Sequence, residues 1–416
     1  MSSTILARLL RDNPIVITGA GSFCAAGNSI DALWQAAIAG KSLARWQEFG
    51  QEDPRERFAV CSAPEPDVSQ PDVHWMRKTD RCVQMAWLAA NQAWNQAQLT
   101  DAYASERIGV IVGSSRGPFN KRNEAQVPHG RRRYLPSLSA NGTFASISGA
   151  LAQSFKLKGP GTTMAATCAS SAFAIGLAAE QILLGKVDAM LVGGTEAPLQ
   201  HSILAQLQSA GVMASHEDAS LACRPFDTSR NGLVLGEGSG FLILESAHSA
   251  QARGAKPLAR LAGWSFSLDN SGRTGVDEGG VGLLQVMEQA LEMAGYAPEQ
   301  IDYINAHGTG TKMNDETEAQ AVTKLFGTRA SVLPCTSTKP VTGHCLGATS
   351  ALEAVICLEA LQRQMVPPTA NCIQQDPLCN INVQPLKPAP AKISTAMSNS
   401  LGFWGYHASL IFARVP

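Results

Sequence analysis

The strongest constraint on the fold is the alternation of short β-rich runs with helical patterns along the whole chain. The β-rich runs include "IGVIVG" (108–113), "AMLVGG" (189–194) and "ASLIFA" (408–413). Helical patterns such as "VQMAWLAANQAWNQA" and "ALEAVICLEALQRQ" lie between such runs. Strands that alternate with helices are typical of proteins with mostly parallel sheets. The sequence therefore predicts an α/β fold.

The pattern of elements occurs twice. In each half a strand leads through a small-residue turn into an Ala-rich helix, as in "TMAATCASSAFAIGLAAEQ" and "STKPVTGHCLGATSALEAVICLEA". Each half also closes on a strand, "GFLILE" and then "ASLIFA". The segment "SAQARGAKPLAR" (249–260), with Gly and Pro between strands, separates the two. We predict two similar halves, residues 1–255 and 256–416.

Composition excludes several classes of protein. The 416 residues carry a formal net charge of −1, which argues against binding nucleic acid or a membrane surface through bulk charge. None of the ten cysteines forms a CxxC pair, which favours a reducing cytoplasm. The sequence has neither a signal-peptide pattern at its start nor a run of about 18 apolar residues. We expect a cytoplasmic protein without a membrane span.

Three residues lie at predicted strand-to-helix turns, where catalytic and binding groups are common in α/β folds. Cys168 lies where a Thr-rich stretch turns into a helix, so it is either a small buried hydrophobe or a nucleophile at a helix N-terminus, where the dipole favours a thiolate. His307 and His344 each follow a strand in a Gly-rich turn, a position where ligands and catalytic groups collect. Their spacing is too wide for a local metal motif, so we expect no metal.

Five motifs together resemble the β-ketoacyl-[acyl carrier protein] synthases (KAS I/II-like ketosynthases), in the condensing-enzyme branch of the thiolase superfamily. They are "ATCASSAFAIG", "CRPFDTSRNGLVLGEGSGFLILE", "NAHGTGTKMND", "STKPVTGHCLGA" and "NSLGFWG". The resemblance runs from "VITGAG" to the last strand, nearly the whole chain. It implies an acyltransferase with a thiolase-like fold, in which duplicated halves stack as five α-β-α-β-α layers, and a dimer formed through the N-terminal half.

The resemblance also implies a mechanism, the decarboxylative Claisen condensation of malonyl-ACP with an acyl chain bound to Cys168. His307 and His344 match the pair that donates to the enolate oxygen, which requires neutral imidazoles of fixed tautomer. Backbone N–H groups of Cys168 and Phe403 match the oxyanion hole, and Phe403 also matches a gate. No resident cofactor is implied, since phosphopantetheine arrives on the acyl carrier protein.

Four further residues match family positions around the two histidines. Lys339 and Glu318 are expected to form a buried ion pair that orders the site, in preference to transferring protons themselves. Thr309 and Thr311 match hydroxyls that hydrogen-bond the pantetheine arm, although structural turn residues would give the same pattern.

A basic stretch, "NKRNEAQVPHGRRRYLP" (120–136), stands out on an otherwise neutral chain. A charge run is often only a solvated face. Because carrier proteins are acidic and the family's docking residues fall near here, Arg131, Arg132 and Arg133 are candidates for carrier docking, with a salt dependence that can be tested.

Two features depart from the family. The usual Gly-Phe-Gly-Gly-Thr-Asn loop reads "GFWGYH", so Trp404 replaces a glycine and predicts a stiffer gate, because tryptophan resists positive φ. We do not expect His407 to be a third catalytic imidazole. Arg116 stands where elongation enzymes carry an apolar residue at the end of the acyl pocket. Since an unpaired buried arginine is costly, Arg116 either pairs at a dimer interface or shortens or polarises the pocket.

These departures favour a specialised pathway, such as polyketide, aryl-polyene or other secondary metabolism, over housekeeping fatty-acid elongation. The expected partners are an acyl carrier protein and a second subunit, either an identical chain or a homologous synthase or chain-length factor. Two other classes stay open. A non-catalytic chain-length-factor-like subunit typically lacks the cysteine, and a thiolase-like transferase acting on CoA esters uses a second cysteine near the C-terminus.

Overall fold

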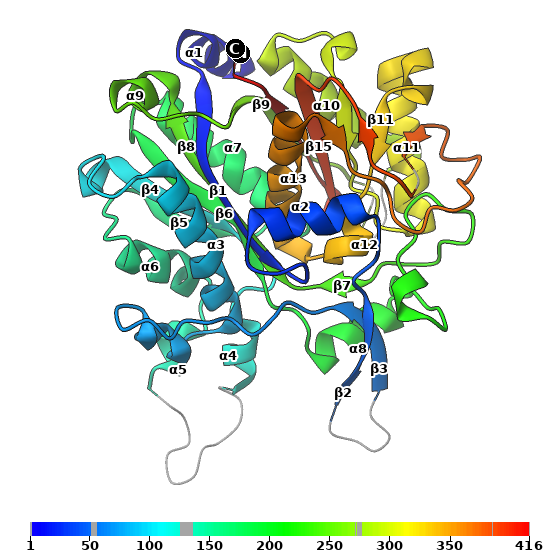
Figure 1. The fold of residues 1–416 in the computed structure, drawn as a ribbon, viewed down its shortest axis with the longest axis horizontal. Helices are drawn as coiled ribbons and strands as arrows, with labels where there is room; N and C mark the ends of the chain where they lie inside the picture. Colours follow the sequence, from blue (N-terminus) through cyan, green and yellow to red (C-terminus); the bar gives the residue numbers. More distant parts are fainter. Residues whose placement is uncertain are drawn as a thin grey trace.

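The computed structural model describes residues 2–50, 56–124, 136–270, 272, 277–384 and 386–415. Within these residues, the main sheet has eleven strands in the order β13-β11-β10-β15-β16-β9-β1-β8-β6-β4-β5 (Figure 1). Its strands are β1 (Ile15–Cys24), β4 (Ile108–Gly113), β5 (Gly161–Met164), β6 (Ala189–Glu196), β8 (Gly238–Ser246), β9 (Ala259–Leu268), β10 (Tyr303–Asn305), β11 (Pro334–Thr336), β13 (Asn382–Val383), β15 (Thr395–Gly402) and β16 (Tyr406–Ala413).

The sheet contains the same strand arrangement twice. From one edge inward, the first part reads β5-β4-β6-β8-β1 and the second reads β11-β10-β15-β16-β9. In each part the first three strands are parallel and the last two pairings are antiparallel. A short pairing of β1 with β9 joins the two parts. The duplication expected from the sequence is therefore present in the topology, while the division between residues 255 and 256 stays a prediction.

Helices cover the sheet in three layers. The long helices are α1 (Ser2–Asp12), α2 (Ile30–Ala39), α3 (Arg81–Ala97), α6 (Ala145–Ser154), α7 (Ser170–Leu183), α8 (His201–Ser209), α10 (Val281–Ala294), α11 (Lys312–Phe326) and α13 (Thr349–Arg363). α3 packs on the first part of the sheet and α10 on the second. α7 and α13 contact strands of both parts and lie in the middle of the molecule (Figure 1). The result is a thiolase-like α-β-α-β-α arrangement.

The remaining elements are short. The helices α4 (Phe119–Glu124), α5 (Leu138–Asn141), α9 (Ala247–Ala252) and α12 (Lys339–Thr342) lie in connections. One small sheet contains β2 (Arg45–Phe49), β3 (Glu56–Cys61) and β7 (Leu235–Gly236). Another pairs β12 (Met365–Val366) with β14 (Ala389–Pro390). None of the helices in the described residues is long and apolar enough to cross a membrane.

The small side chains of α7 explain how a helix fits between two layers of strands. Most of α7 is buried, and Gly176 lies so close to Phe266 and Trp264 that a Cβ there would come within 2.2–2.6 Å of their rings. Close packing of this kind leaves no room for larger side chains. The Ala-rich composition of α7 is therefore a requirement of the central layer.

Candidate active site

Cys168 lies in the turn between β5 and the buried helix α7. The residue before it, Thr167, has a left-handed backbone (φ +47), which turns the chain sharply ahead of the helix. The Ser170 hydroxyl accepts from the Ala166 N–H (2.9 Å) and donates to the Thr167 carbonyl (2.6 Å), so the turn is braced by its own side chain. Cys168 is 8 % exposed and faces a cavity of about 650 Å³.

Burial keeps the Cys168 thiol protonated at rest. It raises the pKa of Cys168 to about 11, although the positive charges of Lys339 and Arg116 and a hydrogen bond from the Phe403 N–H act in the opposite direction. Glu196 adds a smaller raising effect. A thiolate already formed at the helix N-terminus, the sharper of the two expectations for Cys168, is therefore not the resting state.

His307 follows β10, and its backbone is fixed by a buried carboxylate. Glu318, on α11, accepts from the N–H groups of His307 and Gly308, both at 2.8 Å. Burial raises the pKa of Glu318 to about 7. On the imidazole itself, the Lys339 ammonium lies 3.4 Å from Nδ1. An ammonium can only donate, so Nδ1 accepts and the ring proton is on Nε2.

His344 follows β11 and the short helix α12. Its backbone N–H donates to the Val234 carbonyl (2.7 Å), and its Nδ1 lies 3.0 Å from the Thr349 hydroxyl at the start of α13. The ring centroids of His307 and His344 are 5.3 Å apart at an interplanar angle of 84°. Burial, followed by the nearby Lys339 charge, holds the pKa of both histidines well below the usual range. Both imidazoles are therefore neutral at pH 7.

The prediction that Lys339 forms an ion pair with Glu318 is wrong. Lys339 is fully buried, and its ammonium pairs with Glu353 on α13 at 2.7 Å while also donating to the His307 carbonyl. Glu318 instead serves the backbone of the His307 turn. Glu353 was missed because it stands in an apolar helix pattern, "ALEAVICLEAL". Its signal is its isolation, since an acid on a buried helix face needs a partner.

The loop of residues 402–407 lies against Cys168. The Thr167 hydroxyl donates to the Phe403 carbonyl (3.2 Å), and a Cβ at Gly402 would be 3.1 Å from the Cys168 nitrogen. Trp404 adopts φ +66, the conformation that its side chain was expected to resist, and is 59 % exposed. His407 is buried and lies outside the cavity, where its Nε2 is 2.5 Å from Asp269.

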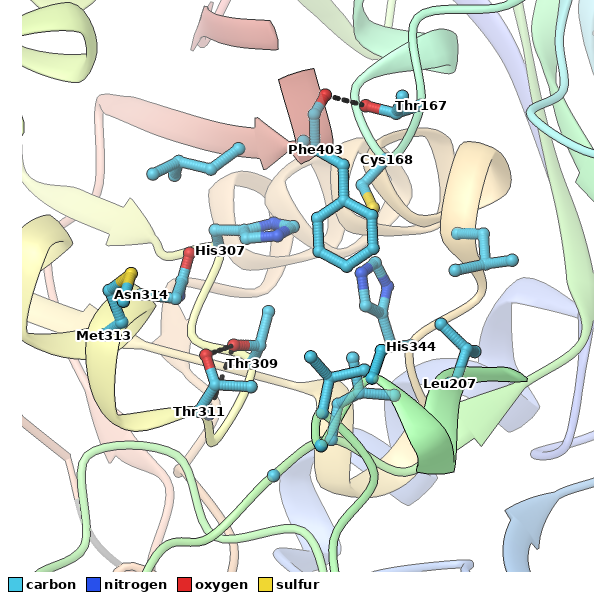
Figure 2. Close-up of a pocket in the computed structure, with 18 of the residues that line it drawn as sticks. Thr167, Cys168, Leu207, His307, Thr309, Thr311, Met313, Asn314, His344 and Phe403 are labelled. Atoms are coloured by element: carbon cyan, nitrogen blue, oxygen red, sulfur yellow. Dashed lines mark hydrogen bonds between the residues drawn. The ribbon is translucent and has the colours of Figure 1, made fainter. Parts of the chain in front are cut away.

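The cavity brings most of the expected site residues together. In Figure 2 the side chains of Cys168, His307, His344 and Phe403 converge, with Thr309 and Thr311 farther along the wall. The Thr309 and Thr311 hydroxyls are 2.9 Å apart. Arg116, Lys312 and Trp404 also line the cavity.

The three arginines predicted to dock the carrier protein, Arg131, Arg132 and Arg133, lie outside the described residues. Glu196, at the end of β6, was missed although it is fully buried below the Arg116 turn. Its Oε1 accepts from the N–H of Ser115 and, at 3.0 Å, from that of Arg116, and burial raises its pKa to about 7.

Comparison with known proteins places this geometry in a family. Residues 12–250 match the N-terminal domain of the β-ketoacyl synthases, and residues 258–373 match their C-terminal domain. The chain belongs to the β-ketoacyl synthase family. It is 34 % identical over 408 residues to the 3-oxoacyl-[acyl-carrier-protein] synthase 2 of Staphylococcus aureus (strain COL), covering 96 % of this chain and 98 % of that protein.

Two solved structures share the fold at lower identity. One is a type II polyketide synthase acyl carrier protein in complex with its ketosynthase bound to the hexaketide (TM-score 0.87, 28 % identity, 97 % of this chain and 100 % of that chain). The other is the ishigamide ketosynthase/chain length factor (TM-score 0.87, 29 % identity, the same coverage). The resemblance inferred from the motifs is confirmed, and this β-ketoacyl synthase is an acyltransferase of the ketosynthase type.

Proposed function

We propose that this β-ketoacyl synthase condenses malonyl-ACP with an acyl chain held on Cys168 and that it works in a specialised pathway. One observation carries the proposal. A buried cysteine with a backbone N–H directed at its sulfur shares one cavity with two neutral imidazoles. Nucleophile, oxyanion donors and hydrogen-bond donors for an enolate are the groups that a decarboxylative condensation needs.

The first step is transfer of the acyl group. The Cys168 sulfur attacks the thioester carbonyl on the carrier arm, a new C–S bond forms at Cys168, and the bond to the arm's sulfur breaks. The thiol proton of Cys168 leaves with the departing pantetheine sulfur. In the proposed step, the N–H groups of Cys168 and Phe403 donate to the carbonyl oxygen as it becomes negative, a role supported by the hydrogen bond from Phe403 to the Cys168 thiol.

The second step uses the two histidines. Loss of CO₂ from the malonyl group leaves an enolate, whose oxygen accepts from the Nε2–H of His307. His344 donates in the same way when the Thr349 hydroxyl donates to its Nδ1. The enolate carbon then attacks the Cys168 thioester, a C–C bond forms, and the C–S bond breaks. The sulfur of Cys168 leaves as the thiolate and takes a proton from solvent water. Thr309 and Thr311 hold the pantetheine arm, and Lys339 and Glu318 position His307.

Two features support a specialised pathway over housekeeping elongation. Arg116 places a cation in the cavity, and Trp404 replaces the small residue of the usual loop. An acyl carrier protein is the proposed partner, docking through Arg131, Arg132 and Arg133, with a second synthase or chain-length factor as the other subunit. Ketosynthases in complex with such partners are among the structures that share this fold.

Intact-protein mass spectrometry tests the proposal. The protein is offered a panel of acyl-carrier thioesters, and a mass increase equal to one acyl group is expected for at least one of them. Cys168→Ala should show no increase. Cys345→Ala is the matched control, because Cys345 is also buried and stands beside His344 but does not line the cavity. If no acyl group loads on the unmodified protein, the non-catalytic partner-subunit alternative replaces this proposal.

A further inference from the structure

Arg116 is held at the cavity wall by its own backbone. Its N–H donates to Glu196 Oε1 (3.0 Å), and its carbonyl accepts from the Arg122 guanidinium. The next residue, Gly117, has φ +62, and a Cβ there would lie 3.0–3.1 Å from the Phe144 ring. The turn after β4 is therefore closely packed, and the fold fixes where the Arg116 side chain begins.

Within the described part of the chain, the guanidinium of Arg116 has no partner. Among the described residues it has no ion pair, side-chain hydrogen bond or stacked aromatic ring. Arg116 is half-buried and is absent from the buried nitrogens that lack a partner, so its guanidinium is accessible, and the residue lines the cavity. A planar fork of five N–H donors in this position is available to a ligand.

The cavity wall has an excess of positive charge. Its described lining residues include Arg116 and, at the mouth, the exposed Lys312, but no carboxylate. Lys339 is compensated by Glu353. The acid that contacts the Arg116 turn, Glu196, does not line the cavity. Its Oε1 accepts from backbone N–H groups, and its Oε2 is buried without a hydrogen-bond partner. An anion in this cavity would therefore be paired by Arg116 without displacing an existing ion pair.

The position of Arg116 indicates which substrate it contacts. It follows β4, the strand beside β5, which leads to Cys168. The apolar side chains Leu207 and Leu346 line the same cavity, and both belong to one apolar cluster with Cys168. In Figure 2, Thr309 and Thr311, the proposed contacts of the carrier arm, lie across the cavity from Leu207. The Arg116 side of the cavity is therefore the side of the acyl group.

We propose that Arg116 is a specificity-determining residue that binds a carboxylate at the far end of the acyl chain on Cys168. The substrate class is then a dicarboxylic acid joined to the carrier as a mono-thioester, with apolar methylene groups along Leu207 and Leu346 and the free carboxylate on the guanidinium. An arginine binds a carboxylate through two parallel hydrogen bonds, which gives both strength and orientation. This inference rests on the proposed function and names its substrate.

The test compares carrier thioesters in pairs of equal chain length, one with a terminal carboxylate and one with a terminal methyl group. Acylation of Cys168 is followed by mass spectrometry without malonyl-ACP, so any preference belongs to the acyl group alone. At the best chain length, the carboxylate member should load faster by about 10- to 100-fold, the range expected for a charge-assisted hydrogen bond. A hydroxyl-terminated chain that loads as fast as the carboxylate would overturn the proposal.

Three variants make the result specific. Arg116→Met keeps the length of the side chain and should abolish or reverse the preference. Arg116→Lys keeps the charge without the fork and should retain part of it. Arg57→Met removes an exposed arginine that does not line the cavity and should leave the preference ratio unchanged. Faster loading of methyl-terminated chains by the unmodified protein would overturn this inference and leave the proposed function intact, whereas no loading of any chain would remove both.

Discussion

The two parts of the sheet use one architecture for different chemistry. The turn after β4 and the turn after β10 occupy equivalent places, and each is fixed by a buried carboxylate that accepts backbone N–H groups, Glu196 in one and Glu318 in the other. The first turn presents Arg116 to the cavity and the second presents His307. The backbone device is shared, and the identity of one side chain decides what each turn does.

The turns after β5 and β11 differ in the same way. The first carries Cys168 and has no charged group of its own, whereas the second carries His344 together with Lys339, which pairs with Glu353. Burial, with a smaller effect from Glu196, raises the pKa of Cys168, while burial and Lys339 together keep the histidines neutral. In the proposed mechanism, the first part therefore supplies the nucleophile and the second part supplies the groups that stabilise negative charge.

Removing the buried Lys339 ammonium should have the largest effect on stability. Lys339→Met leaves Glu353 buried without its partner, so we expect the free energy of unfolding to fall by about 3–5 kcal/mol. Urea denaturation measures it. The double variant Lys339→Met with Glu353→Leu removes both charges and should recover most of the stability but not the condensation rate, because His307 Nδ1 has lost its donor. A single variant within about 1 kcal/mol of the unmodified protein would contradict the assigned role of the pair.

The sequence predicts a strand where large apolar residues dominate the run and misses a strand where they do not. The strands 108–113, 189–194, 240–245 and 408–413 were predicted because Val, Ile, Leu and Phe dominate them, and β4, β6, β8 and β16 contain those runs. β15, "TAMSNSLG", was missed. It is fully buried beside α13, β10 and β16, but Thr395 is its only β-branched residue, and its Ser and Asn residues resemble a loop in the sequence.

The site was predictable where chemistry is carried by rare residues and unpredictable where it is carried by packing. Cys168, His307 and His344 stand out in Gly-rich turns, and the structure places all three in one cavity. Glu196 and Glu353 look like ordinary acids in strand and helix patterns. Only the folded chain shows that one supports a backbone turn and the other neutralises Lys339.

Removing either histidine should slow condensation without stopping acyl loading on Cys168. His307→Ala and His344→Ala leave Cys168 intact, so acyl loading should continue, while condensation should slow by about 10²- to 10³-fold for each, the usual cost of losing one donor to a developing oxyanion. Mass spectrometry of the acyl-enzyme and release of CO₂ from malonyl-ACP measure the two steps. His407→Asn is the matched control, because His407 is buried but lies outside the cavity, and its loss should leave CO₂ release far less affected.

The first part carries a pH dependence that one substitution can isolate. Burial raises the pKa of Glu196 from 4.5 to about 7, so the folded protein holds a proton that the unfolded chain releases. This stabilising contribution is complete below about pH 4.5 and is lost as the pH rises to about 7, amounting to at most about 3 kcal/mol. The unmodified protein should therefore lose this much more stability than Glu196→Gln over that range. Parallel pH profiles of the two proteins, from urea denaturation, would show that Glu196 is ionised throughout.

The smallest effect concerns the loop that covers the boundary between the two parts. Trp404 has φ +66 and ψ +20, a conformation that is costly for a residue with a Cβ and free for glycine. Trp404→Ala and Trp404→Gly both remove the exposed indole, and only the second relieves the backbone. Trp404→Gly should therefore be more stable than Trp404→Ala by about 1 kcal/mol in urea denaturation.

The same pair of Trp404 variants shows whether the indole side chain or the left-handed backbone of Trp404 controls access to the cavity. If acyl loading on Cys168 changes equally in both, the indole itself controls access to the cavity, since that is what both have lost. If loading changes only in Trp404→Gly, the left-handed backbone controls access, because only glycine lets residues 402–407 move away from the Cys168 nitrogen. An alanine variant as stable as the glycine variant would show that the loop leaves the left-handed region once the indole is gone, and the strain assigned to Trp404 would then belong to its side-chain packing.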